Sequence, residues 1–229
     1  MKAAFLILST INSNPSNAAN ALAQLEQCLT TLSESYELSP NAVIEYSDPG
    51  LNEAQKQSLL QHADLLAEFR PNELITKLKE QRLAEGNPIA PESYQELLKI
   101  VALNWFLQNA QSSGLFKDMD YIVLLDSHTE LENGIVNLLN QDELIKNKFF
   151  FKKALSSQIP GKKALAAMYY PTEQWAYSAD LTDELIDHVI EASENAYKLL
   201  ESGSDDKTYT CLGHELFDVV DLARVHFLV

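Results

Sequence analysis

The chain has 229 residues, of which 46% are hydrophobic and 22% charged, and its formal net charge at pH 7 is −16. This composition is typical of a globular protein, and the length allows one large domain or two small ones. Such an acidic surface repels nucleic acid and anionic lipid, so neither is expected as a partner, and an anionic small ligand would need local cations or a metal.

The amino terminus carries a short apolar run, residues 3–8, which Ser, Thr and Asn residues follow closely. The run is at the short edge of what a signal peptide needs, so a buried first strand is the better interpretation. No stretch approaches the roughly 18 apolar residues of a membrane span. Cys28 and Cys211 lie far apart and belong to no close-spaced motif, which favours two reduced thiols over a disulfide. We therefore expect a cytoplasmic protein.

Short apolar runs alternate with helical patterns through the first 72 residues. Asn14 is the predicted N-cap of the first helix, with Pro15 at its first position and leucines along one face. The alternation favours a mainly parallel sheet with helices on both faces. The predicted strands are 2–9, 41–48 and 63–72, and the predicted helices between them are 14–32 and 51–62.

The second part of the chain begins with helices. Residues 92–111 have apolar side chains around most of the helix circumference, which predicts a central position, and Gly114 is predicted to end this helix. A buried strand over 121–125 follows. Because no linker or repeat is evident, we predict one domain over 1–229. Further predicted helices are 72–86, 133–147 and 182–201, and short strands are predicted within 146–155 and 162–170.

The strand over 121–125 runs directly into Asp126-Ser127-His128. Residues i and i+2 of an extended segment point the same way, so Asp126 and His128 can reach one ion. Ligands of open α/β sheets bind outside the carboxyl ends of the strands, and a carboxylate beside an imidazole suits Mn²⁺ or Mg²⁺ carrying a diphosphate. The alternative is a turn after a core strand, in which Asp126 caps the next segment.

The stretch YIVLLDSHTELENGIVNLLNQ (121–141) resembles the segment of GT-A glycosyltransferases that holds their DxD motif. More narrowly, it is similar to the Asp-Ser-His version of polypeptide GalNAc-transferases and GlcNAc-transferase-like families. The preceding ALNWFLQNA (102–110) resembles a helix common in such folds, with Phe106 where a small residue is usual. The resemblance implies an α/β fold: a three-layer α/β/α, GT-A-like (Rossmann-like) domain with a mainly parallel mixed central sheet.

This resemblance implies a metal-dependent glycosyltransferase with a nucleotide-diphosphate sugar donor, for which UDP is the expected nucleoside diphosphate. Asp126 and His128 would bind the Mn²⁺ or Mg²⁺ that bridges the two phosphates. These families usually take a third ligand nearer the carboxyl terminus, for which His214 and His226 are candidates. We prefer His214 because its polar neighbours predict an accessible loop, whereas His226 lies in an apolar strand.

The acceptor side is expected in the carboxyl-terminal part of the chain. The segment GHELFDVVDLAR (213–224) loosely resembles the region that follows the acceptor site in many of these enzymes. Glu215 or Asp218 would then be the base of an inverting reaction, unless the segment is an amphipathic helix with solvated carboxylates. Trp105 and Trp175 are expected to be packing residues, with Trp175 the better candidate to stack on a sugar because it follows Pro171 in an apparent loop.

The same resemblance implies a nucleotide-binding set at the ends of the first three strands. Ser9 and Thr10 would contact the nucleoside, Glu45 or Asp48 would contact the base, and Arg70 would face the diphosphate beside Asp126. Residues 1–130 would form the nucleotide-sugar-binding half and residues 131–229 the acceptor-side half.

Two other functions stay open from the residues alone. The segment EYSD (45–48) stands where the commonest branch of the family has a DDxS signature, and the chain is short, so a non-catalytic GT-A-like binding protein is the main alternative. A nucleotidyltransferase shares the sheet and the strand-end acid, but it usually carries a Gly-rich basic loop after the first strand. Residues 9–17 contain neither glycine nor a basic residue, which ranks this alternative last.

Overall fold

The protein is described here from a computed structural model, which covers residues 1–127, 129–158, 167–202 and 211–228. The main sheet contains strands β1 (Ala3–Ser9), β2 (Asn41–Glu45), β3 (Leu65–Glu68), β4 (Tyr121–Asp126), β5 (Phe149–Phe151), β8 (Gln174–Ser178) and β9 (Val225–Phe227). A small hairpin pairs β6 (Leu155–Ser156) with β7 (Met168–Tyr169). The helices are α1 (Ala18–Ser35), α2 (Glu53–Leu59), α3 (Glu73–Ala84), α4 (Pro91–Ser113), α5 (Asn133–Asn140), α6 (Thr182–Ser202) and α7 (Leu212–Val219), with short 3-10 turns η1 (Ile11–Ser13), η2 (Ala179–Leu181) and η3 (Leu222–Arg224).

The seven strands of the main sheet follow the order β3-β2-β1-β4-β8-β5-β9. Strands β1 to β4 are parallel to one another, β8 pairs antiparallel with both β4 and β5, and β9 is parallel to β5. Strand β8 therefore runs antiparallel to the other six strands of the sheet. The predicted mainly parallel mixed sheet is confirmed, and strands from both sides of residue 130 share it.

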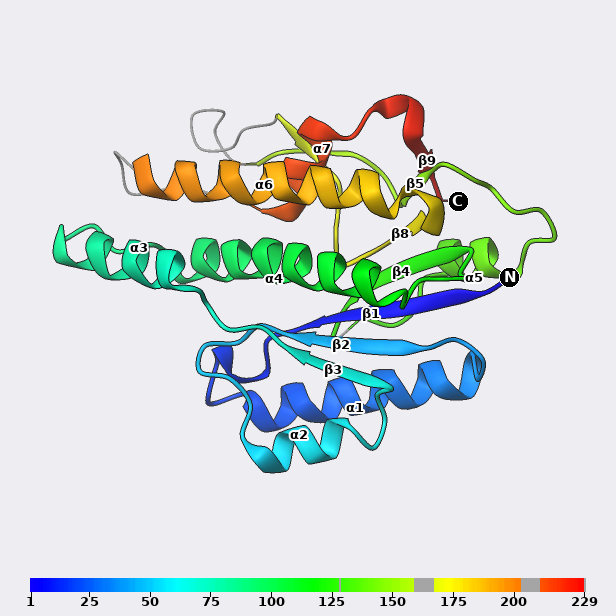
Figure 1. The fold of residues 1–229 in the computed structure, drawn as a ribbon, viewed down its shortest axis with the longest axis horizontal. Coiled ribbons are helices and arrows are strands. Elements are labelled where there is room, and N and C mark those ends of the chain that lie inside the picture. The colour runs from blue at the N-terminus through cyan, green and yellow to red at the C-terminus, as the bar shows by residue number, and fades with distance from the viewer. Residues whose placement is uncertain (128, 159–166, 203–210, 229) are drawn as a thin grey trace.

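Helices cover both faces of the sheet, which is why its central strands are apolar on both sides. On one face, α3, α4, α6 and α7 pack on side chains such as Leu6 and Leu124. On the other face, α1, α2 and α5 pack on alternate side chains such as Ile7 and Val123. Figure 1 shows α1 and α2 at the bottom of the molecule and α6 and α7 at the top. The three-layer α/β/α arrangement predicted from the sequence is confirmed.

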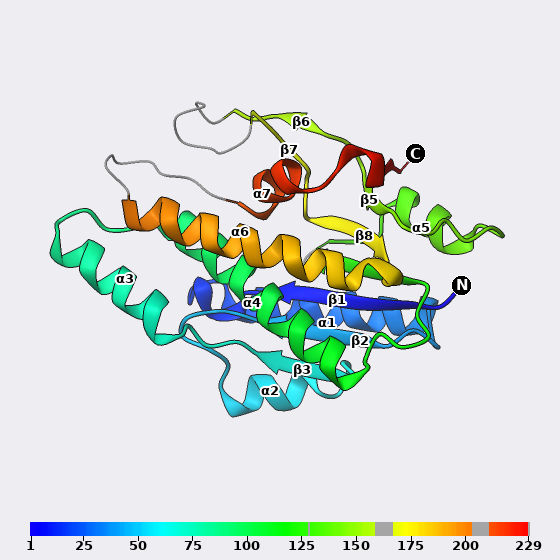
Figure 2. The same ribbon diagram turned by 45° about the horizontal axis from the view of Figure 1, so that its top comes forward.

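Helix α4 lies between the sheet and α6, as its all-round apolar pattern predicts. Figures 1 and 2 both show α6 running alongside α4. Gly114 ends α4 with φ +74°, a left-handed conformation that glycine adopts without steric cost. Because α4 is held on two sides, polar groups that it carries are taken out of water and need partners within the protein.

Two predicted helix boundaries are wrong. Helix α1 begins at Ala18 rather than after Asn14, because the Asn14 side chain accepts hydrogen bonds from the Ser16 backbone N–H and hydroxyl and forms a local turn. Helix α5 ends at Asn140 rather than 147, and Ile145 N–H instead donates to the Tyr121 hydroxyl (2.8 Å). Helix α6 spans the predicted 182–201, although Gly203, its predicted stop, lies outside the described residues.

None of the helices in the described ranges combines the length and the apolar character needed to cross a membrane.

Candidate active site

The carboxyl ends of β1, β2, β3 and β4 meet at one edge of the sheet. The pairing aligns Ser9 with Glu45, Glu45 with Glu68, and Leu8 with Asp126. This edge is where open α/β sheets bind their ligands. The sheet topology therefore brings most of the predicted nucleotide-binding residues to the same edge.

The pleat of the strands separates these residues onto two faces. Leu124 belongs to the core beneath α4, so Asp126, two residues later, faces α4. Val43 and Ile7 belong to the opposite core, so Glu45 and Ser9 face the α1–α2 side. Sequence spacing along each strand fixes this parity, but only the pairing of the strands shows which face each side chain takes.

Asp126 forms an ion pair with Lys99, which projects from the middle of α4. Lys99 Nζ lies 2.8 Å from Asp126 Oδ1 and donates a hydrogen bond to Oδ2 at 3.1 Å. The shorter contact lies off the hydrogen-bonding direction, so buried Oδ1 accepts no well-directed hydrogen bond. The side chains are 6% and 19% exposed, which places the pair at the boundary between core and solvent.

This ion pair lies in the wall of a cavity of about 280 Å³. The lining brings together the end of β4, helix α4, the β6–β7 hairpin, and the first turn of α7. The described lining residues are Glu96, Lys99, Asp126, Ser157, Gln158, Tyr169, Tyr170, Thr172, Glu173, Cys211 and His214. Three carboxyl groups face one ammonium in this set, so the cavity is acidic when all are ionised.

Lys99 carries the positive charge among the described residues that line this acidic cavity. Burial alone would lower the pKa of Lys99, but the negative charges of Asp126 and Glu96 raise it above its ordinary value, so the ammonium stays protonated. Burial raises the pKa of the Glu96 carboxyl, an effect that Lys99 opposes. Glu96 also accepts a hydrogen bond from Leu212 N–H (3.3 Å), which ties α4 to the start of α7.

His214 lies on the cavity wall, but not in the accessible loop predicted for it. It belongs to the first turn of α7 and is 4% exposed. Its Nδ1 lies 2.8 Å from Cys211 Sγ and its Nε2 lies 2.8 Å from Ser157 Oγ, so both ring nitrogens have protein partners. Burial lowers the pKa of His214. A metal-ligand role for His214 would require one of these partners to leave.

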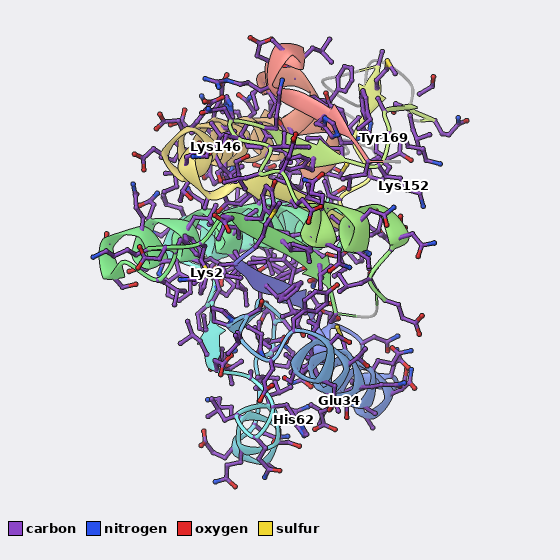
Figure 3. The ribbon with its side chains drawn as sticks, turned by 90° about the vertical axis from the view of Figure 1, so that its right-hand side faces the viewer. Lys2, Glu34, His62, Lys146, Lys152 and Tyr169 are labelled. Atoms are coloured by element: carbon purple, nitrogen blue, oxygen red, sulfur yellow. The ribbon has the colours of Figure 1, made fainter. Side chains whose placement is uncertain are left out.

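The His214 ring stacks on Tyr169, with centroids 5.0 Å apart and an interplanar angle of 21°. Figure 2 shows β7 beside α7, the arrangement that makes this contact. In Figure 3, Tyr169 and Lys152 lie near the top of the molecule, while Glu34 and His62 lie at the bottom with α1 and α2. The aromatic wall of the cavity therefore belongs to the part of the chain predicted to face the acceptor.

The two predicted acceptor-side carboxylates differ in position. Glu215 is 1% exposed within α7, next to His214. Asp218 is exposed and does not line the cavity. The segment is a helix from Leu212 to Val219, as the amphipathic interpretation predicts, but of the two carboxylates only Asp218 is solvated. Either role as a base stays a prediction.

On the opposite face, Glu45 holds the loops that follow β1 and β2. It accepts hydrogen bonds from the backbone N–H groups of Ile11 and Ser47, both at 3.1 Å, and from the Ser47 hydroxyl. Burial raises the pKa of Glu45 above its ordinary value even though these hydrogen bonds oppose the shift. Ser9 is buried beside it, and Thr10 is half-buried just before η1. The Glu45 carboxylate is therefore directed toward hydrogen-bond donors of the protein itself.

Asp48 and Arg70 are exposed and lie outside the cavity lining. Asp48 pairs with Lys79 of α3 (3.1 Å) and accepts a hydrogen bond from the Tyr94 hydroxyl (3.4 Å). Arg70 pairs with Glu68 (2.5 Å), and its guanidinium covers Gly50 so closely that a Cβ there would overlap it. In the structure Arg70 fixes the loop after β2, and its contact with a diphosphate stays a prediction.

Only some of the predicted metal ligands lie in the part of the chain that the structure describes. His128 lies outside the described residues. His226 is in β9, as predicted, and its ring packs against Phe150 with centroids 5.6 Å apart. Within the described ranges, no group of three His, Cys, Asp or Glu side chains is arranged to hold a metal ion.

Trp175 is a packing residue, as predicted, but the loop expected around it is a strand. Trp175 lies in β8, is completely buried, and stacks on Phe151 with centroids 5.4 Å apart. Of the polar neighbours that predicted a loop, Thr172 and Glu173 precede this strand, and Gln174 is its first residue. Trp105 is 40% exposed and packs against Phe69, which agrees with a packing residue at the rim.

Sequence reasoning missed three residues that organise the site. Lys99 and Glu96 lie one helical turn apart on α4, and a lysine inside the apolar run LLKIVAL was the available signal. Gln174, 6% exposed, accepts from Glu132 N–H (2.7 Å) and donates to Glu130 O (2.8 Å), so it holds the segment that follows the Asp126 motif. Only the pairing of β4 with β8 brings Gln174 there, and the sequence carries no signal for it.

No protein-family profile and no curated protein sequence matches this chain. Solved structures do match it over nearly its full length. Core-mannan synthase A (Ktr4) of Aspergillus fumigatus, in its Mn/GDP form, matches with a TM-score of 0.52 and 11% identity over 99% of this chain and 72% of its own. The mannosyltransferase Ktr4p of S. cerevisiae matches with a TM-score of 0.54 and 10% identity over 98% of this chain and 68% of its own. The complex of the same yeast protein with GDP matches with a TM-score of 0.50 and 11% identity over 99% of this chain and 69% of its own. The chain therefore has the GT-A fold of these glycosyltransferases.

Proposed function

We propose that this chain transfers a glycosyl group from a nucleoside diphosphate sugar to an acceptor, in the cavity at the end of β4. The observation that carries this proposal is the position of Asp126. The acid of the Asp-Ser-His motif ends a central strand and faces the cavity, on the fold of known sugar transferases. The motif, its position at the carboxyl end of the parallel strands and the fold all agree, which supports a transferase over a general binding module.

The nucleoside of the donor is proposed from the matching structures and from the Asp-Ser-His motif. The matching Aspergillus structure is the Mn/GDP form, and a yeast Ktr4p structure is a complex with GDP. The Asp-Ser-His resemblance instead implies UDP. Both nucleotides are therefore candidates, with residues 1–130 as the donor half and residues 131–229 as the acceptor half.

Asp126 fits a divalent cation that arrives with the diphosphate. Carboxylate oxygens are the ligands that Mn²⁺ and Mg²⁺ prefer, and buried Oδ1 already attracts a cation, the Lys99 ammonium at 2.8 Å, without accepting a well-directed hydrogen bond. Asp126 would hold the cation together with phosphate oxygens and water, and His128 remains the second predicted ligand. When bound, the cation supplies positive charge that stabilises the leaving nucleoside diphosphate.

The surrounding residues keep Asp126 in place. Asp126 N–H donates to Glu173 O (2.9 Å), and Ser127 N–H donates to Leu8 O (3.0 Å), so the motif is fixed to β8 and β1. Gln174 restrains the following segment from the same side. Such backbone anchoring orders the carboxylate before a ligand arrives, which lowers the entropy cost of binding.

The acceptor is expected at the aromatic wall formed by Tyr169 and His214. Flat rings suit the apolar faces of sugars, and Glu173 offers an exposed carboxylate on the same cavity. In an inverting reaction a carboxylate removes the acceptor proton as C1 is attacked. Glu215 and Asp218 are the bases predicted from the sequence, and Glu173 is the candidate that the cavity adds.

The experiment is a thermal-shift and calorimetric comparison of UDP, GDP, CDP and ADP, each with and without Mn²⁺. A nucleotide at about 100 times its dissociation constant should stabilise the fold by about 2.7 kcal/mol. Asp126→Asn should abolish the metal-dependent part. Asp120→Asn is the matched control, because Asp120 lies directly before the other end of β4 and accepts a hydrogen bond from Lys2 N–H (2.8 Å). Binding of no nucleotide by the wild type would contradict the proposal, and binding would be followed by an assay of donor hydrolysis.

A further inference from the structure

We propose that Lys99 acts as an internal cation that holds Asp126 in the free protein and releases it to the divalent metal that enters with the donor. This inference rests on the proposed function of the cavity. It assigns Lys99 as a positioning residue that competes with the metal for one carboxylate and thereby makes metal binding depend on the nucleotide.

The cavity carries an excess of negative charge. Its described lining has three carboxyl groups, from Glu96, Asp126 and Glu173, against the single ammonium of Lys99. With all of them ionised the formal charge is −2, so a bare diphosphate would be repelled. One ammonium is therefore too little to bind the donor alone, and a divalent cation must enter with it.

The Lys99 ammonium contacts the carboxylate that a metal would need. A metal at this strand end needs a carboxylate oxygen, and both oxygens lie within 3.1 Å of Lys99 Nζ. The ammonium thus contacts both oxygens of the carboxylate. A buried carboxylate without a cation would be costly, so the free protein benefits from this pairing. In the proposal, a metal binds these oxygens in place of the ammonium.

The Lys99 ammonium has other carboxylates in the cavity with which it can pair. Glu96 lies one turn earlier on α4, and Glu96 and Glu173 both interact electrostatically with the Lys99 ammonium. The flexible four-carbon stem lets the ammonium turn toward these carboxylates or toward a bound phosphate. Release of Asp126 therefore leaves neither charge unpaired, because the metal compensates Asp126 while Glu96 and the diphosphate compensate Lys99.

The consequence is coupling between the two ligands. Without nucleotide, the metal has to displace the Lys99 ammonium from Asp126 unaided, so metal alone binds weakly to the free protein. Nucleotide phosphates attract the displaced ammonium and coordinate the metal, so each ligand strengthens the binding of the other. Coupling of this kind typically changes affinities by about 5- to 150-fold.

The test is Mn²⁺ binding by the full chain without nucleotide, followed by electron paramagnetic resonance of the free ion. Lys99→Met removes the competitor and should bind Mn²⁺ on the order of tenfold more tightly than the wild type. Lys99→Arg keeps the cation and should bind as weakly as the wild type. In the Lys99→Met/Asp126→Asn double variant the gain should disappear. Equal or weaker binding by Lys99→Met, or a gain that persists in the double variant, would overturn the proposal.

A measurement on the wild type covers the case in which Lys99→Met does not fold. The ¹⁵N signal of the Lys99 ammonium, assigned with Lys99→Arg, should move when Mg²⁺ and nucleotide are added together and should move much less with either one alone. An unchanged signal at saturation would overturn the proposal. Failure of every nucleotide to bind would instead count against the proposed function, and the Mn²⁺ comparison would still decide the role of Lys99.

Discussion

At the scale of single residues, His214 shows how burial changes the chemistry of a side chain. A histidine among polar neighbours would titrate near its ordinary pKa of about 6.5 in an accessible loop. In α7 both ring nitrogens contact protein atoms, and the ring stacks on Tyr169. Burial disfavours the charged imidazolium, so the pKa is lowered.

This shift predicts a pH dependence of stability. Below a pH of about 6.5 the unfolded chain binds a proton at His214 that the folded chain does not bind, so the free energy of unfolding should fall as the pH falls through this range. Urea unfolding between about pH 5 and pH 8 should therefore show a steeper pH dependence for the wild type than for His214→Gln. His62→Gln, at an exposed position, is the matched control for the loss of an imidazole. Identical pH dependences for wild type and His214→Gln would contradict this account.

At the scale of elements, the contact between α7 and β7 closes the cavity. Gly213, the second residue of α7, accepts a hydrogen bond from Tyr170 N–H (3.1 Å). A Cβ at Gly213 would lie 2.1 Å from Tyr170 O, a backbone atom that no rotamer change can move. The glycine therefore sets how closely the helix that carries His214 approaches the β6–β7 hairpin.

We expect Gly213→Ala to lower the free energy of unfolding by about 1–3 kcal/mol, the usual cost of overpacking. Alanine normally stabilises a helix relative to glycine by up to about 1 kcal/mol, so the backbone clash must outweigh that gain. Gly134→Ala is the matched control. Gly134 is also the second residue of an eight-residue helix, α5, but a Cβ there would lie 2.9 Å from the Cβ of Leu228, a milder overlap than the 2.1 Å at Gly213. Urea unfolding should show the larger loss for Gly213→Ala, and a larger loss for Gly134→Ala would contradict the packing argument.

At the scale of the whole molecule, charge works against compactness. The formal net charge of −16 means that folding concentrates many carboxylates on one surface. Exposed ion pairs, such as Lys198 with Glu194 (3.0 Å), contribute little in return because water and salt screen them. The same excess of negative charge is present among the described residues of the cavity, where three carboxyl groups face one ammonium.

Salt should therefore stabilise the protein. Raising NaCl from about 0.02 M to about 0.3 M shortens the screening length from more than 20 Å to about 6 Å, which weakens repulsion across the surface. The free energy of unfolding, measured in urea because urea is uncharged, should rise over this range. A fall with added salt would mean that local ion pairs outweigh the net repulsion.

Local patterns were sufficient for much of the fold. Apolar runs predicted β1, β4 and the central helix α4, because burial on both faces requires apolar side chains whatever the neighbouring elements are. They were insufficient for Trp175, where polar residues before β8 predicted a loop. Helix ends were also missed where a side chain offered an alternative hydrogen bond, as at Asn14.

The sequence by itself determined the strand that ends in Asp126, the alternation of strands and helices, and the acidic character of the molecule, because these depend on residue type and spacing along the chain. Only the tertiary structure decided which side chains face Asp126. Lys99 and Glu173 lie 27 and 47 positions away from it along the chain, and strand pairing and helix packing bring them to one cavity. The same packing oriented Glu45 inward and buried His214, because a side chain takes the face that its neighbours in space leave to it.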